Sequence, residues 1–219
     1  MARARRSWQE KLADSKDLPK AVEMSGAARA KWGAGTMVVP APVDVDSLMK
    51  KVPSRKVVTV AELRTALASQ AGTTTACPLT TGIFAWIAAN AAYEAELEGR
   101  RKITPWWRTL KGGGELNPKF PGGLVEQKSR LEAEGHRVVT RGKRMFVEAC
   151  ERAIWKGCQS APPWPMHELT GRLRFDDLNV LRLLHLDEHD VIAQERLAGH
   201  PDCLPIVVLG GFLDAGLSK

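Results

Sequence analysis

The chain has 219 residues, 44% of them hydrophobic and 26% charged, which predicts one domain, or one domain with an appendage, and excludes wholesale disorder. No apolar run reaches the roughly 18 residues of a membrane-spanning helix, no apolar signal core follows the basic N-terminus, and four scattered cysteines exclude a disulfide scaffold, so we expect a cytoplasmic protein without a membrane partner. The net charge is +7, and residues 100–144 hold 12 Lys/Arg against 4 Asp/Glu, which favours a polyanionic partner such as nucleic acid.

We expect the first part of the chain, residues 1–43, to form a loosely organised lead-in. A short helix fits residues 7–17, but glycines and prolines between residues 33 and 42 interrupt any regular element there. A second short helix is expected over residues 46–52, with Asp46 as its N-cap and Pro53 directly after its end.

Two helices joined by a short connection follow. Thr59 and Glu62 form a capping box for a helix over residues 60–69, and Pro78 suits the first turn of a longer helix that reaches about Glu98. The longer helix carries six alanines beside large apolar residues, so most of it must be buried. The pattern is typical of a helix-turn-helix, and a small helical core of another kind is the alternative that it leaves open.

The basic segment predicts short elements. We expect an extended stretch at 103–110, a helix at 124–134, strands at 136–140 and 144–148, and a helix that begins near Phe146.

Beyond residue 157 the composition changes. Residues 160–165 are expected to form a linker, and residues 176–197 a helix, in a segment whose net charge is acidic. We therefore expect an α+β protein with a lead-in at 1–43, a central domain at 44–157 and a helical C-terminal appendage at 158–219, whose role the sequence does not indicate.

A series of motifs between residues 56 and 135 carries a family resemblance. After the two helices come Thr104-Pro105-Trp106-Trp107-Arg108-Thr109-Leu110, Gly114-Glu115-Leu116, Pro121-Gly122-Gly123, Gln127 and Leu131-Glu132-Ala133-Glu134-Gly135. In this order and spacing the segment resembles the winged-helix domain of the alkylguanine-DNA alkyltransferases, with their Pro-Cys-His-Arg-Val core, Gly-Gly before a helix and final Glu-Gly. The resemblance implies a mainly helical winged-helix DNA-binding domain with a small β-hairpin.

The departures from the family pattern decide the expected chemistry. Trp106 stands where the family keeps its alkyl-accepting Cys, and Trp107 where it keeps the activating His. Alkyl transfer requires a thiolate beside a base, and an indole is neither. We therefore expect no enzyme, no catalytic residue, no cofactor and no metal.

The same replacement occurs in the alkyltransferase-like proteins, so the resemblance is closest to them. It implies that the protein senses DNA damage by binding alkylated guanine, does not repair it, and passes the lesion to excision-repair proteins. An extruded base would stack on an aromatic wall, which offsets part of the cost of flipping it. The implied base pocket consists of Pro105, Trp106, Trp107, Arg108, Gly122 and Gly123. A buried aromatic pair in the core is the alternative interpretation of the two tryptophans.

Duplex DNA is the expected partner of a monomeric protein. Leu79 stands where the family has the Arg that fills the gap of the extruded base, and Val60 replaces a Tyr that turns the target phosphate. An apolar wedge can still enter a base step. Phosphate contacts are expected from residues near the start of the second helix, after its end and at the hairpin tip: Thr80, Thr81, Arg100, Arg101, Lys102, Arg141, Lys143 and Arg144.

Two other hypotheses stay open on the sequence. One is a winged-helix structural or regulatory module that binds undamaged DNA, RNA or a protein partner and has lost the lesion pocket. The other is an enzyme whose chemistry lies in the C-terminal segment, where His185 and His189 fit an H-x-x-E-H zinc pattern without a third ligand downstream. Cys150, Cys158, His167 and Cys203 lack the short spacing that metal sites use.

Overall fold

A computed structural model describes residues 6–157 and 172–174 of the protein. Contacts divide the chain into two units, Met1–Asn179 and Val180–Lys219, and all described residues belong to the first. The linker expected at 160–165, the helix expected at 176–197 and the zinc pattern at 185–189 lie outside the described residues. Within the described residues, no helix combines the length and the apolar run needed to cross a membrane.

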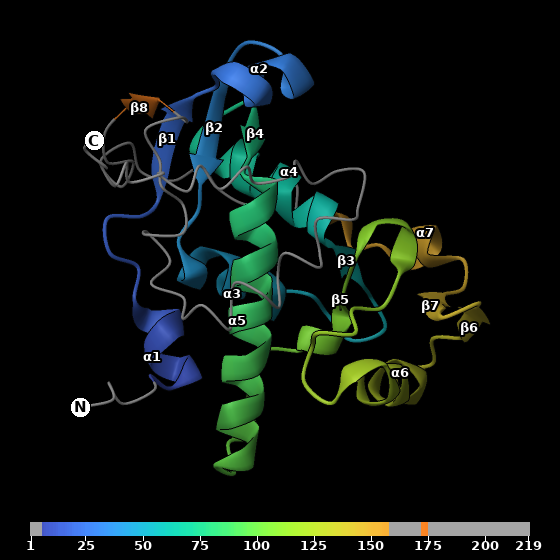
Figure 1. Ribbon diagram of the computed structural model, residues 1–219. Helices are drawn as coiled ribbons and strands as arrows, with labels where there is room; N and C mark the ends of the chain where they lie inside the picture. Colours follow the sequence, from blue (N-terminus) through green and yellow to red (C-terminus); the bar gives the residue numbers. More distant parts are fainter. Residues whose placement is uncertain (1–5, 158–171, 175–219) are drawn as a thin grey trace, which may run out of the picture. The chain divides into compact units, whose positions relative to one another are not determined.

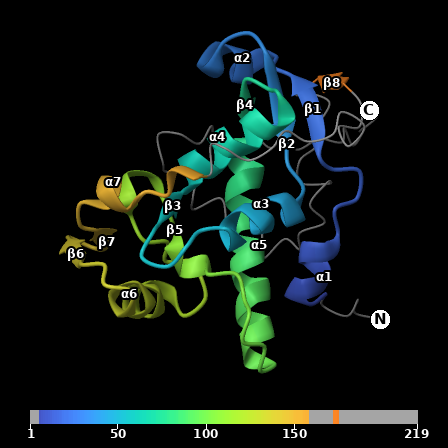
Figure 2. The ribbon, with the colours of Figure 1, turned by 180° about the vertical axis from the view of Figure 1, so that it is seen from behind.

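The helix α5, Pro78–Leu97, is the central element of the described unit. It packs against α1 (Trp8–Ala13), α3 (Pro42–Lys50) and α4 (Val60–Ala71), as Figures 1 and 2 show. Its alanines lie buried and let these neighbours approach closely. The predicted bounds of α5 and the capping box of α4 are confirmed: proline occupies the first turn of α5, and the Thr59 side chain accepts from the Glu62 amide.

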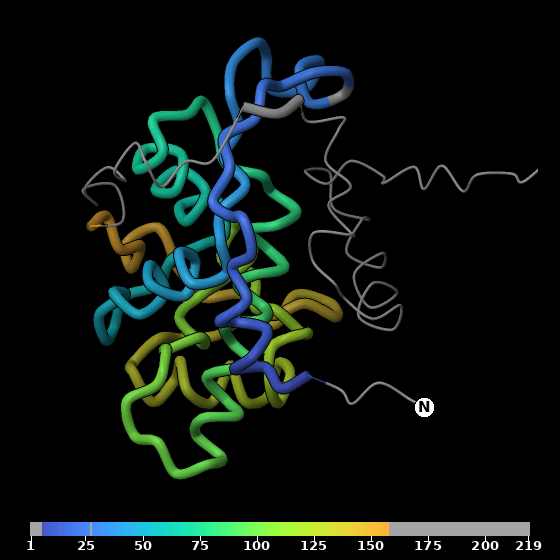
Figure 3. The backbone as a smooth tube through the Cα atoms, turned by 90° about the vertical axis from the view of Figure 1, so that its left-hand side faces the viewer, coloured from blue at the N-terminus to red at the C-terminus, as the bar shows by residue number. Residues whose placement is uncertain are grey.

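A small sheet lies at the N-terminal end of α5. Its order is β4–β2–β1–β8, formed by Thr75–Ala76, Thr36–Val39, Lys20–Glu23 and Arg172–Arg174. β1 and β2 are antiparallel, whereas β4 pairs with β2, and β8 with β1, in parallel. The helix α2, Gly26–Trp32, connects β1 to β2. In Figure 3 residues 8–39, in blue, run from α1 at one end of the unit to α2 at the other.

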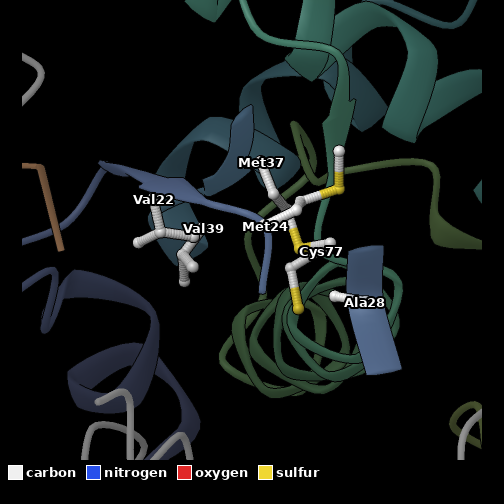
Figure 4. Close-up of a cluster of buried hydrophobic side chains, with 6 residues drawn as sticks. All are labelled: Val22, Met24, Ala28, Met37, Val39 and Cys77. Atoms are coloured by element: carbon white, nitrogen blue, oxygen red, sulfur yellow. The ribbon is translucent and has the colours of Figure 1, made fainter. Parts of the chain in front are cut away.

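The first core cluster joins this sheet to the start of α5. Its six buried side chains come from β1, α2, β2 and the residue before α5, and Figure 4 shows them together: Val22, Met24, Ala28, Met37, Val39 and Cys77. Leu79, in the first turn of α5, packs against the cluster. The Cys77 amide also donates to the Val38 carbonyl at 2.8 Å. The N-terminal sheet thus covers the beginning of α5.

A second core cluster holds the remaining elements together. α6 (Gly123–Ala133), α7 (Cys150–Ala153) and the hairpin β6–β7 (Val138–Arg141 and Arg144–Val147) surround the short parallel pair β3–β5 (Val58–Thr59 and Thr109–Leu110). Two 3-10 turns, η1 (Trp106–Arg108) and η2 (Gly112–Gly114), flank β5. The buried members of the cluster are Val57, Leu110, Leu116, Leu131, Val147 and Cys150.

Three local predictions are wrong. Asp46 is not an N-cap: α3 begins four residues earlier, and the Asp46 carboxylate is buried, accepting from the Thr104 hydroxyl and the Lys50 ammonium at 2.6 Å each. The stretch at 103–110 is not extended throughout, because η1 occupies its middle. The last predicted helix begins at Cys150 instead of Phe146, since Phe146 belongs to the hairpin.

Helices and small sheets together confirm the α+β class, and the winged-helix assignment stays a prediction. The division at residue 43 also stays a prediction. The structure adds that α3 begins at Pro42 and that strands from the lead-in pair with β4, so the lead-in is more regular than its glycines and prolines indicate.

The buried Asp46–Thr104 hydrogen bond ties α3 to the segment that enters η1. Replacing Thr104→Val removes the donor and leaves one carboxylate oxygen buried without it, which should lower the free energy of unfolding by about 2 kcal/mol. Urea denaturation measures this loss. Thr65→Val on the exposed face of α4 makes the same chemical change and should cost less than about 0.5 kcal/mol; equal losses would contradict the role of the hydrogen bond.

Candidate nucleic-acid interface

Trp106, the residue on which the expected base pocket depends, is wholly enclosed. It opens η1, and its side chain has 0% solvent exposure. The rings of Trp107 and Phe120 meet it edge-on, each with its centroid 5.9 Å away. Its Nε1–H has no hydrogen-bond partner among the described residues. The indole therefore packs as a core side chain in this structure and lines no open cavity.

Arg130 of α6 closes this aromatic cluster. The central carbon of its guanidinium lies 5.3 Å from the Trp106 ring and 4.9 Å from the Trp107 ring. Two carboxylates hold it there: Glu96 at 2.8 and 3.1 Å, and Glu126 at 2.7 Å. Burial opposes the charge of Arg130, but these hydrogen bonds outweigh it and raise its pKa further. A base that reached Trp106 would have to displace this guanidinium or one of the two neighbouring rings.

Trp107 and Arg108 are fixed by one carboxylate, that of Glu134 at the end of α6. The Trp107 indole donates to Glu134 at 2.9 Å, and Arg108 donates through Nε and Nη2 at 2.6–3.0 Å. Arg108 also donates to the Val52 carbonyl at 2.6 Å. Burial alone would raise the pKa of Glu134, but the donors from Arg108, Trp107 and the Arg55 amide outweigh it, so its pKa is lowered.

A buried side chain of α6 holds the segment between η1 and α6 through hydrogen bonds to its backbone. Gln127 is fully buried; it accepts from the Asn117 amide at 2.7 Å and donates to the carbonyls of Trp107 and Thr109. Gly122 has φ +67°, and a Cβ there would lie 2.4 Å from that of Glu126, so the turn into α6 requires glycine. This turn places Phe120 against Trp106.

The predicted pocket residues are thus only partly brought together. Pro105, Trp106, Trp107 and Arg108 are adjacent around η1, while Gly122 and Gly123 form the start of α6 and contribute conformation rather than a wall. The structure adds Phe120, Gln127, Arg130 and Glu134 to the same cluster. Gln127 and Glu134 were visible in the motifs that carry the resemblance, but no sequence signal pairs Arg108 with Glu134 or places Arg130 over the tryptophans.

The expected contacts at the start of α5 need correction. Thr80 and Thr81 are buried, and both hydroxyls donate to the Cys77 carbonyl, at 3.4 and 2.7 Å. Leu79 packs against the first core cluster instead of projecting from the helix. The two threonine side chains are therefore not available to DNA in this structure, and Leu79 is half-buried against the N-terminal sheet.

The cations that follow α5 are at the surface. Arg100, Arg101 and Lys102 are all exposed, and Arg100 lies 3.3 Å from Glu98 in a solvated ion pair. A phosphate contact requires this exposure. Their role in binding phosphate stays a prediction.

The hairpin β6–β7 presents the predicted basic tip. Arg141 and Arg144 are directly opposite in the pairing, and both guanidiniums lie 5.4 Å from the Phe146 ring. Lys143 is exposed in the two-residue turn, where Gly142 adopts φ +62°. Like charges that face each other across a hairpin are unfavourable. Arg144 is partly offset by Glu115, 3.3 Å away. The tip is therefore a concentrated, solvent-exposed positive charge.

The base of the hairpin is anchored. The Leu116 amide donates to the Met145 carbonyl at 2.9 Å, and Val138, Met145 and Val147 pack into the second core cluster. The tip is thus carried on a supported element and not on a free loop.

Metal chemistry finds no support in the part of the chain that is described. No group of three or more His, Cys, Asp or Glu residues that could hold an ion occurs among the described residues. Cys150 is buried, which raises its pKa and favours the thiol. Its proposed companions Cys158, His167 and Cys203 lie outside the described residues.

Comparisons with known proteins were made with the sequence and with the fold. No protein-family model and no curated protein sequence matches the chain. Among solved structures, the chain is similar to S. pombe Atl1, crystallised in complex with damaged DNA containing O6-carboxymethylguanine. The identity is 18% and the TM-score 0.32, over 52% of this chain and 94% of that one. That TM-score is too low to assign a shared fold or function.

Removing the charge of Glu134 should destabilise the protein. Glu134→Gln leaves the nearly buried Arg108 guanidinium without its counter-ion, and we expect a loss of about 3 kcal/mol at neutral pH in urea denaturation. Since the folded pKa of Glu134 is depressed, its stabilisation is present above the unfolded pKa and is lost as the pH falls through the folded one. The difference between wild type and variant should therefore shrink in acid.

The matched control is Glu132→Gln, two residues earlier on the exposed face of α6. The Glu132 carboxylate makes only a long ion pair with Lys128, at 3.8 Å. It should change stability by less than about 0.5 kcal/mol at every pH. A Glu134→Gln effect that is as small, or that grows in acid, would contradict the ion-pair account.

Proposed function

We propose that this protein is a non-catalytic DNA-binding protein that contacts duplex DNA through its basic hairpin. The observation that carries the proposal is the hairpin tip, where Arg141, Lys143 and Arg144 crowd together in solvent on a supported element. Duplex DNA carries a dense row of negative charges, and cations that neutralise phosphates release its counter-ions, which supplies affinity without base contacts.

The lack of an exposed cysteine among the described residues supports a binding role. In the motif that resembles the alkyltransferase core, Trp106 and Trp107 replace the reactive pair, and the two described cysteines are buried. A buried thiol with a raised pKa, as at Cys150, is a poor nucleophile. The protein binds, on this proposal, and leaves covalent repair of DNA to others.

The finer proposal is that the bound duplex carries an alkylated guanine, as in the alkyltransferase-like sensors that the sequence resembles. The neighbour Atl1 was crystallised with such damaged DNA. An extruded base would occupy the place of the Arg130 guanidinium over Trp106, a planar cation exchanged for a planar ring. The full enclosure of Trp106 favours a second candidate, in which the module binds undamaged duplex and the indole serves only the core.

Reversing the tip charges should weaken DNA binding. Arg141→Glu with Lys143→Glu is expected to lower affinity for every duplex alike and to reduce the slope of log affinity against log salt by about 2. Fluorescence anisotropy between about 50 and 200 mM salt measures both.

The control is Arg29→Glu with Lys31→Glu in α2, an equal change of net charge on the exposed side of the N-terminal sheet region. It should keep the wild-type slope. Salt-independent binding by the wild type, or equal losses in the two double variants, would contradict the role of the hairpin.

Lesion recognition separates the two candidates. If the base pocket forms around Trp106, the wild type should prefer a duplex with O6-alkylguanine by about tenfold, and Trp106→Phe should reduce that preference while the affinity for undamaged duplex stays. Trp32→Phe in α2 makes the same replacement far along the chain and should leave the preference unchanged. Equal affinity of the wild type for both duplexes would reject the sensor and leave the undamaged-duplex module.

A further inference from the structure

The outward face of the hairpin carries cations at its base as well as at its tip. Side chains alternate along β6, so Val138, which packs into the second core cluster, faces inward, and Arg137, Val139 and Arg141 face outward. Across the pairing, Phe146 is opposite Val139 and contributes its ring to the same outward face. Cations therefore flank an aromatic ring at both ends of this face.

A second group of cations adjoins the base of the hairpin, at the C-terminal end of α6. Arg55 and Lys56 are exposed in the loop before β3, and the Arg55 amide donates to Glu134 at 3.1 Å. The Arg55 guanidinium would lie 3.9 Å from a Cβ at Gly135, the residue that precedes His136. We call Arg55, Lys56, His136 and Arg137 the base patch.

Several of these charges act on the side chain of His136. Burial lowers its pKa first; Arg108, Arg55 and Lys56 lower it further, and only the Glu134 carboxylate acts in the opposite direction. Its Nε2 is enclosed and has no hydrogen-bond partner among the described residues. Two acids lie among these groups: Glu134, which accepts from Arg108 and Trp107, and Glu148, 3.4 Å from Arg137 in an exposed pair. Against Arg55, Lys56, Arg108 and Arg137 they leave a net positive charge.

We propose that the base patch is a second phosphate-contact site, which binds the duplex together with the hairpin tip. This inference rests on the proposed function and specifies where the duplex lies: along the outward face of the hairpin, from the tip to the end of α6, and away from the N-terminal end of α5. The occupant is a DNA phosphate group, because flexible exposed cations suit a polyanion and offer no shaped contact to a base edge.

The spacing of the two contacts fits a duplex. Arg137 directly precedes β6, and it lies four residues from Arg141 along this extended segment, which corresponds to about 13 Å. The major groove is about 12 Å wide, so the tip and the base patch can contact phosphates on the two sides of one groove. The Phe146 ring then lies between them, over the groove.

The experiment compares charge reversals on the full-length protein with a short fluorescent duplex. Arg55→Glu with Lys56→Glu should weaken binding at least as much as the tip variant, about tenfold or more, and lower the salt slope by about 2. The α2 pair Arg29→Glu and Lys31→Glu should bind like the wild type. Thermal melts of each variant establish that the fold is kept. Arg55→Gln with Lys56→Gln repeats the test with a milder change and should also lower the slope of log affinity against log salt.

A second readout locates the phosphate. A phosphate held at the base patch favours the protonated imidazole, so the pKa of His136, followed by nuclear magnetic resonance, should rise when duplex saturates the protein. If the tip variant weakens binding while the base-patch variants and the His136 pKa do not respond, the base-patch inference is wrong and the proposed function stands. If the wild type binds no duplex at low salt, the proposed function itself is wrong.

Discussion

The burial of α5 is the constraint on which the rest of this structure depends. A helix of twenty residues whose alanines pack against α1, α3 and α4 becomes the axis of the unit, and its small side chains are what allow that packing. The N-terminal sheet packs against its first turn through Leu79 and the preceding Cys77. In the same turn the Thr81 hydroxyl donates to the Cys77 carbonyl. A helix buried in this way cannot lie in a DNA groove while the sheet stays in place. On the proposed function, contact with DNA would therefore fall to cations on other elements, above all on the hairpin β6–β7.

The aromatic cluster shows how the motif residues around η1 build a core. Phe120, Trp107 and the Arg130 guanidinium surround the Trp106 indole. The unpartnered Nε1–H of Trp106 is the one polar group of this arrangement left unsatisfied among the described residues that form it. Such a group costs free energy when buried, and a ligand that accepted a hydrogen bond from it would recover that cost. This gives the lesion hypothesis a physical basis, while the ion pairs of Arg130 with Glu96 and Glu126 are what the base would have to break.

The sequence predicted best where local rules decide the structure. The Thr59–Glu62 capping box and the proline that opens α5 are each set within a few residues, and each is confirmed. It failed where distant segments decide. Asp46 is a good N-cap by type, but its carboxylate is used by Thr104, far along the chain. Thr80 and Thr81 look available at a helix start, but both are buried and donate to the Cys77 carbonyl. Nothing local indicates that Glu134 binds Arg108, or that the Arg55 guanidinium lies beside Gly135 at the end of α6.

Backbone hydrogen exchange with and without a short duplex tests the location of the DNA most directly, because it reports every segment at once. Binding along the outward hairpin face predicts added protection at residues 53–57 and 136–147, and unchanged exchange at residues 20–39 and 75–82. Added protection at 75–82, together with faster exchange in the sheet at 20–39, would mean that the sheet opens and α5 itself meets the duplex, and would contradict this account.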